Sequence, residues 1–103
     1  MSKPYISHEE ATVESFKKDP DYAAEYLNAV LEDGSQEELM LALRRVASAF
    51  GMSEVAESSK LNPKTLYRTL SAAGNPELRS FQAILGAMGM RLAVTPLARV
   101  YSQ

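Results

Sequence analysis

The sequence predicts an all-α protein: one compact helical domain that carries an N-terminal helical extension and ends in a short β-strand. Apolar residues recur at three- and four-residue steps over most of the chain. Capping residues precede several of these periodic segments, and glycine follows them. No long linker interrupts the 103 residues, a length typical of one domain.

The composition excludes several classes of protein. Hydrophobic residues make up 46% of the chain and charged residues 23%, as in ordinary globular proteins. The absence of cysteine excludes disulfides and thiolate metal sites. The N-terminal "MSKPYISHEE" lacks the apolar run of a signal peptide, and no segment has the roughly 18 apolar residues of a membrane span. We therefore expect a cytoplasmic protein that does not enter a membrane.

The charges are divided between two parts of the chain. Residues 1–43 hold three lysines and ten acids, a net charge of -7. Residues 44–103 hold eight basic residues and three acids, a net charge of +5. This division indicates two surfaces with different tasks. The alternative is that solvated charges are merely distributed unevenly.

Two helices are predicted in the N-terminal third. Ser7 and Glu10 fit a capping box that opens a short helix ending near Lys18. Asp19 fits the N-cap of the next helix, with Pro20 at its first position. The apolar stripe of this second helix contains Tyr22, Tyr26, Leu27, Val30 and Leu31.

A third helix has the clearest pattern. Gly34 is expected to end the preceding helix in a left-handed conformation. Ser35 and Glu38 then form a capping box, and Gly51 ends the third helix. Its apolar stripe contains Leu39, Leu43, Val46, Ala47 and Phe50.

The C-terminal part predicts one more helix and a strand. Asn75 is expected to cap the helix with Pro76 at its first position, and Gly89 to end it. The following "MRLAVTP" alternates apolar and outward-facing residues up to Pro96, which favours a short strand. That strand could pair with a second copy of the chain, or the segment could pack on its own domain. The buried face of the helix is expected to contain Leu78, Phe81, Ile84, Leu85 and Met88.

The stretch "SEVAESSKLNPKTLYRTL" predicts two short helices joined by a tight corner. Ala56 fits the small residue where the helices cross, and Val55, Leu61 and Leu66 fit the apolar contacts that fix their angle. This pattern is typical of a helix-turn-helix, whose second helix enters the DNA major groove. Two short helices around a polar corner also occur in helical bundles that bind no DNA.

The outward residues of this motif have side chains suited to DNA. Arg68 can bind guanine O6 and N7 bidentately, and Lys64 can do the same or bind phosphate. Thr65 and the Tyr67 hydroxyl suit a phosphate or a base edge. The candidate DNA-binding residues are Ser53, Asn62, Lys64, Thr65, Tyr67 and Arg68.

The ends of the two short helices raise one difficulty. Ser53 is expected to cap the first helix and Asn62 the second. The corner usually carries glycine because one residue there adopts positive φ, and this sequence has Lys60 instead. A left-handed lysine costs on the order of 1 kcal/mol. Alternatively, Ser58 and Ser59 take up the bend.

Enzyme chemistry is not expected from this sequence. His8 is the single histidine, and without cysteine it fits neither a usual zinc site nor a Cys–His pair. We predict no catalytic residue, no metal site and no cofactor.

The run "GMSEVAESSKLNPKTLYRTLSAAGNPELRSFQAILGAMGMRLAV" closely resembles the addiction-module antidote proteins, the HigA-type antitoxins of toxin–antitoxin operons. It is most similar to the group described as prophage-derived helix-turn-helix DNA-binding proteins. The motifs "LYRTLS", "GNPE" and "LGAMGMRL" carry the resemblance, which covers about residues 14–95. It implies a λ-repressor-like domain that binds its own operator as a homodimer and represses its operon. It also implies a RelE/ParE-like toxin partner, encoded by the neighbouring gene.

The resemblance places the recognition helix on Asn62 to Ser71. Residues 1–34 are then expected to form the N-terminal helical extension and candidate toxin-binding surface. Residues 35–103 are expected to form the helix-turn-helix domain with its C-terminal strand, as one compact unit with the extension. The alternatives are a stand-alone prophage transcriptional regulator and a protein-interaction module without DNA binding. Candidate acidic contacts for a basic toxin are Glu9, Glu10, Glu14, Asp21, Glu25, Glu32 and Asp33, around Tyr5, Phe16 and Tyr22.

Overall fold

The computed structural model of the protein describes residues 15–97. Helices make up most of this part of the chain, which contains no β-strand, and the predicted all-α class is confirmed. Residues 15–18 are also helical and lead into the first complete helix. The complete helices are α2 (Pro20–Asp33), α3 (Gln36–Phe50), α4 (Met52–Ser59), α5 (Pro63–Thr69) and α6 (Leu78–Ala87).

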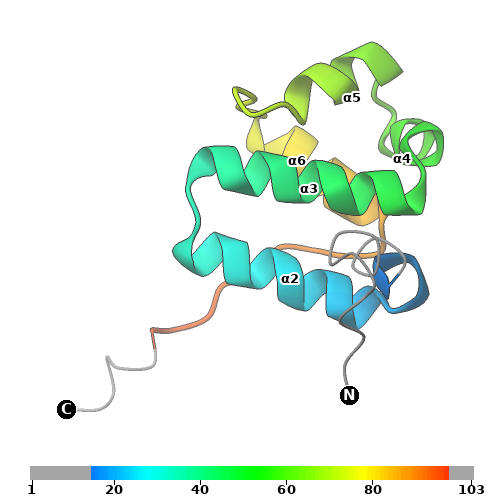
Figure 1. Ribbon diagram of the computed structural model, residues 1–103. Coiled ribbons are helices and arrows are strands. Elements are labelled where there is room, and N and C mark those ends of the chain that lie inside the picture. Colours follow the sequence, from blue (N-terminus) through cyan, green and yellow to red (C-terminus); the bar gives the residue numbers. More distant parts are fainter. Residues whose placement is uncertain (1–14, 98–103) are drawn as a thin grey trace, which may run out of the picture.

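Helix α3 is central to the arrangement of the helices. It runs antiparallel to α2 as a helical hairpin, with α2 on one side and α5 on the other (Figure 1). Helix α4 packs against α3, α5 and α6, so it joins the two ends of the domain. The α2–α3 hairpin and α5 are therefore separate surfaces, joined through α4.

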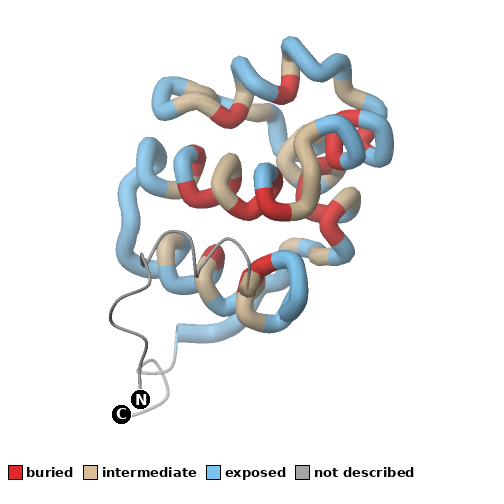
Figure 2. The backbone as a smooth tube through the Cα atoms, turned by 45° about the vertical axis from the view of Figure 1, so that its right-hand side comes forward, coloured by how far each residue is buried: buried red, intermediate tan, exposed pale blue. Residues whose placement is uncertain are grey.

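The core lies between the inner faces of these helices, and solvent covers the outer faces (Figure 2). Leu43 and Met88, two of the expected apolar core residues, are 0% and 3% exposed. Leu78 is expected on the buried face of its helix but is 64% exposed, so that prediction is wrong. Leu31, on the apolar stripe of α2, is 47% exposed. Leu78 is the first residue of α6, and Leu31 lies in the last turn of α2. The largest fully buried side chains are Phe16, Met40, Leu43, Val46, Val55, Leu66, Leu70 and Ile84.

The beginnings of α2 and α3 confirm their predicted caps. The Asp19 carboxylate accepts hydrogen bonds from the backbone N–H groups of Asp21 and Tyr22, at 3.1 and 3.3 Å. The Ser35 hydroxyl accepts from the Glu38 N–H at 3.1 Å, and the Glu38 carboxylate accepts from the Ser35 N–H at 2.8 Å. The second capping box therefore forms as predicted. The box predicted at residues 7–10 lies outside the described residues.

Two predicted helix ends differ from the structure. Gly34 has φ -89° and ψ 166°, so it is extended rather than left-handed. Only Gly34 and Ser35 separate α2 from α3, and the extended backbone carries the chain directly into the Ser35 cap. Helix α6 begins at Leu78, with Glu77 as N-cap, so the predicted capping by Asn75 is wrong. Asn75 and Pro76 instead lie in the connection between α5 and α6, outside both helices.

Gly74 explains the tight turn before α6. Its N–H donates to the Ser71 carbonyl at 2.8 Å, and its carbonyl accepts from the Gln36 side chain at 3.2 Å. A Cβ atom on Gly74 would fall on the carbonyl oxygen of Thr69. The turn therefore requires glycine, and it ties the end of α5 to the beginning of α3.

The predicted C-terminal strand is not confirmed. Residues 91–97 have no regular secondary structure. Leu92 packs partly against the core, whereas Val94 and Leu97 are 97% and 73% exposed. A strand needs backbone partners, and the described part of one chain offers no neighbouring strand.

Candidate nucleic-acid interface

Helix α4 begins directly where α3 ends. Gly51, at φ 106°, is both the C-cap of α3 and the N-cap of α4. No side chain caps α4, and Ser53 lies inside its first turn. The predicted Ser53 cap is therefore wrong, because the sharp turn at Gly51 leaves no separate capping residue. Ser53 is nevertheless exposed at the beginning of the motif.

The corner between α4 and α5 is built on a left-handed lysine. Lys60 has φ 62° and ψ 30°. The Leu61 N–H donates to the Ala56 carbonyl at 3.0 Å, and the Lys60 N–H donates to the Glu57 carbonyl at 3.2 Å. These two bonds define a Schellman motif, whose left-handed position favours glycine. The bend does not fall on Ser59, which is the last residue of α4.

The same motif ends α6, this time with glycine. Gly89 has φ 80°, and the Met90 N–H donates to the Leu85 carbonyl at 2.9 Å. Lys60 is the only non-glycine residue with positive φ in the described part of the chain. The corner is therefore a strained position, and the burial of its neighbours holds it in place.

Apolar residues fix the packing across the corner. Val55 and Ala56 on α4 are 1% and 2% exposed, and Leu66 on α5 is fully buried. Leu61 is partly buried against the same core. These are the residues that the sequence predicts as contacts between the two helices.

Helix α5 begins with a side-chain cap. The Asn62 carboxamide oxygen accepts a hydrogen bond from the Lys64 N–H at 2.8 Å, and Pro63 is the first helical residue. Asn62 is therefore confirmed as the predicted N-cap. The helix ends at Thr69, two residues before the predicted Ser71.

One side of α5 is buried and the other faces solvent. Leu66 is fully buried, and so is Leu70 directly after the helix. Three side chains that the sequence predicts to read DNA are exposed, and Thr65 between them is half-buried. The exposed candidates on α5 are Lys64, Tyr67 and Arg68.

Arg44 of α3 joins this face. Its guanidinium lies over the Tyr67 ring, 5.0 Å from the ring centroid, which is the geometry of a cation–π contact. Tyr67 is 46% exposed, so one part of the ring is held by Arg44 and another remains open to solvent. Sequence reasoning missed Arg44, because it stands on another helix and no local spacing relates it to Tyr67.

The charge around α4 and α5 is positive. Residues 52–69, which form α4, the corner and α5, hold three basic and two acidic residues, a net charge of +1, and Arg44 of α3 adds a further positive charge beside Tyr67. Residues 19–43 hold seven acids and no lysine or arginine. Five of these acids lie on or directly before α2, which packs on the other side of α3 from α5 (Figure 1), and two lie in the first turn of α3. With a Debye length of about 8 Å at physiological salt, separated surface charges are largely screened from each other.

The exposed α5 face carries groups that suit nucleic acid. A guanidinium can donate two parallel hydrogen bonds to guanine O6 and N7, and an ammonium can bind the same edge or a phosphate. Hydroxyl groups such as those of Thr65 and Tyr67 can donate to phosphate oxygens. Together these groups can both position a protein on a duplex and read its bases.

The described residues contain neither a candidate metal site nor a membrane-spanning helix. Within residues 15–97, no three His, Cys, Asp or Glu side chains gather where they could hold a metal ion. No helix in that range combines the length and apolar character needed to cross a membrane. His8 lies outside the described residues.

Two comparisons with known proteins relate this chain to others. A family model described as "Probable addiction module antidote protein" matches residues 9–96. A Haemophilus influenzae protein described as "Uncharacterized protein" is 30% identical over 69 residues, which is 67% of this chain and 71% of that protein. No solved structure matches the chain.

Proposed function

The chain belongs to the addiction module antidote family, and we propose that it is the HigA-type antitoxin of a type II toxin–antitoxin module. In this proposal α4 and α5 form a λ-repressor-like helix-turn-helix that binds operator DNA and represses the operon. The protein also neutralises a RelE/ParE-like toxin encoded beside it. It acts in the cytoplasm, where its operator is.

The observation that carries the DNA-binding proposal is the two-sided character of α5. Leu66 locks its inner side into the core, while Lys64 and Arg68 extend into solvent from the other side. A helix held this way presents a fixed set of donors, as a recognition helix must. The net charge of +2 that Arg44 and residues 52–69 carry together favours approach to phosphate.

We further propose that the operator-bound form is a homodimer. One α5 helix of seven residues spans only about 10 Å, enough for one half-site. Two-fold related copies would read two half-sites one helical turn apart. The exposed Val94 and Leu97 offer apolar surface for pairing the C-terminal segments of two copies.

Binding to the DNA upstream of the protein's own operon tests the DNA-binding proposal. In a gel-shift titration, the upstream duplex should be retained at much lower protein concentration than a scrambled duplex of equal length. Its affinity should fall steeply between 50 and about 200 mM salt, because phosphate contacts release counterions. Equal retention of both duplexes, or a flat salt response, would contradict operator recognition.

Co-expression with the neighbouring gene tests the antitoxin proposal. We expect the neighbour to encode a small basic protein that arrests growth when expressed alone. Growth should recover when this chain is co-expressed, and the two proteins should co-purify. Arrest without rescue, together with operator binding, would support a stand-alone regulator instead.

A further inference from the structure

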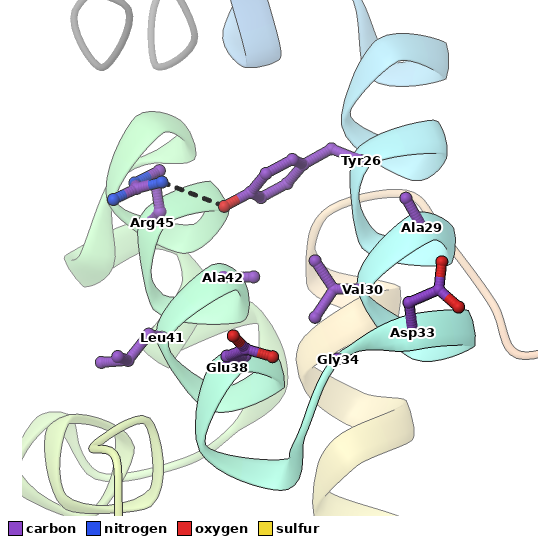
Figure 3. Close-up of a pocket in the computed structure, with 9 residues that line it drawn as sticks. All are labelled: Tyr26, Ala29, Val30, Asp33, Gly34, Glu38, Leu41, Ala42 and Arg45. Carbon is purple, nitrogen blue, oxygen red and sulfur yellow. Dashed lines mark hydrogen bonds between the residues drawn. The ribbon is translucent and has the colours of Figure 1, made fainter.

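The hairpin of α2 and α3 carries a groove that the DNA-binding face does not use. Its volume is about 560 Å³. Val30 of α2 lies in its middle, and the Arg45 guanidinium donates to the Tyr26 hydroxyl at 3.0 Å at one end (Figure 3). Asp33 and Glu38 lie at the other end. The groove is open, because it lies along the outer surface between two helices rather than inside the core.

Exposed apolar side chains line this groove. Leu41 lines it from α3 and is 51% exposed, and Ala29 lines it from α2 and is also exposed. These apolar side chains therefore remain partly in water in the single chain. Clustered exposed apolar side chains with a polar rim are typical of protein interaction sites.

The charge around the groove selects the kind of partner. Four exposed acids surround the Gly34 end of the hairpin, whereas the one basic side chain that lines the groove, Arg45, lies at its opposite end and donates to the Tyr26 hydroxyl. Such a surface repels phosphate, so it does not suit nucleic acid. It attracts a segment rich in lysine or arginine, and complementary charge speeds such an encounter. The four acids are Glu32, Asp33, Glu37 and Glu38.

We propose that the α2–α3 groove is the docking site for a basic segment of the toxin, one that inserts an apolar side chain beside Leu41. This inference rests on the proposed antitoxin function. The segment's cations lie against Asp33 and Glu38, and its apolar side chain covers the half-exposed leucine. Because α3 separates the groove from α5 (Figure 1), one molecule can hold toxin and DNA at once.

Two pairs of full-length variants test this site, with the toxin encoded beside the chain as the probe. Leu41→Ala removes apolar contact inside the groove, and Leu78→Ala removes a leucine outside it that is 64% exposed. Asp33→Lys reverses charge inside the groove, and Glu57→Lys reverses an exposed acid on α4 outside it. Calorimetry measures toxin affinity, gel shift measures operator affinity, and circular dichroism measures helix content.

Toxin affinity should fall about tenfold for each groove variant and by less than about threefold for each control. Operator affinity and helix content should stay at wild-type values for the groove variants. Toxin binding unchanged by Leu41→Ala and Asp33→Lys would overturn the groove while leaving the antitoxin function intact. Equal losses for Asp33→Lys and Glu57→Lys would mean diffuse attraction only, and would also overturn it.

Two further outcomes would show either that a second copy of the chain occupies the groove or that the protein binds no toxin. A groove variant that alters the oligomeric state in light scattering, with toxin affinity unchanged, would assign the groove to a second copy of the chain. A wild-type protein that binds no toxin would defeat the proposed antitoxin function itself, and the docking site with it. The toxin affinity of the wild-type protein thus distinguishes a wrong docking site from a wrong antitoxin function.

Discussion

Arg44 on α3 holds its guanidinium over the ring of Tyr67 on α5, with 5.0 Å between the guanidinium carbon and the ring centroid. The two residues are far apart in the sequence, yet this contact ties the outer face of α5 to the central helix. Tyr67 is half exposed, so the contact leaves part of the ring accessible. Arg44 therefore positions a candidate DNA-binding side chain and adds a positive charge beside it.

The coupling between these residues can be measured. Arg44→Ala and Tyr67→Leu, alone and combined, form a double-mutant cycle. We expect a coupling free energy of about 0.5–1 kcal/mol in urea unfolding, as for a partly exposed cation–π pair. Arg44→Lys should retain part of it, since an ammonium also binds a ring face. Additive effects of the two single changes would show that the contact contributes nothing to stability.

Lys60→Gly should stabilise the protein. The corner holds a left-handed residue at φ 62°, and glycine removes a strain of about 1–2 kcal/mol. Glycine also gains freedom in the unfolded chain, so the net gain should be about 0.5–1 kcal/mol. Lys60→Ala removes the same side chain but keeps the strain, and should leave the unfolding free energy nearly unchanged. If glycine and alanine gave the same stability, left-handed strain would not be the reason.

Changes at Asn62 separate helix capping from DNA contact. Asn62→Ala removes the acceptor for the Lys64 N–H and should lower the unfolding free energy by about 1 kcal/mol. Asn62→Asp keeps a capping oxygen, so thermal unfolding should stay close to wild type. The added carboxylate should nevertheless weaken operator binding, because it lies beside the proposed phosphate contacts. Wild-type operator affinity for Asn62→Asp would place the DNA away from the beginning of α5.

Gly74→Ala should be strongly destabilising. The new Cβ would meet the Thr69 carbonyl, so the turn between α5 and α6 must open, at a cost of about 2 kcal/mol or more. Gly86→Ala is the matched control, since a Cβ there meets no atom within 4 Å. In helix α6 that change should stabilise by about 0.5–1 kcal/mol. Denaturant unfolding of both variants checks the contrast, and similar effects would contradict the steric account of the turn.

Local patterns in the sequence were enough for the helices and several of their ends. The caps at Asp19 and Ser35 follow from side chains that reach backbone groups two or three residues away. The inward contacts across the corner follow from apolar spacing, and Val55 and Leu66 are buried as predicted. The left-handed corner was one of two predicted possibilities, and backbone hydrogen bonds select it at Lys60.

Features that depend on tertiary placement could not be predicted in this way. The Arg44–Tyr67 contact and the α2–α3 groove each join residues on different helices, which no local spacing relates. Gly51 is the N-cap of α4 and Ser53 is its second helical residue, so Ser53 forms no cap although serine is a favourable capping residue. The C-terminal alternation predicts a strand, but pairing depends on a partner that the sequence of one chain cannot supply.

The most direct test of the account is the operator affinity of two charge-matched double variants, measured by fluorescence anisotropy. One combines Lys64→Ala with Arg68→Ala on α5, and the other combines Lys17→Ala with Lys18→Ala, exposed lysines far from α5 in the sequence. Both remove two positive charges. The account predicts that the α5 variant binds its operator at least about 100-fold more weakly with unchanged circular dichroism, and that the control stays within about threefold of wild type. Equal losses for the two variants, or wild-type affinity for the α5 variant, would contradict it.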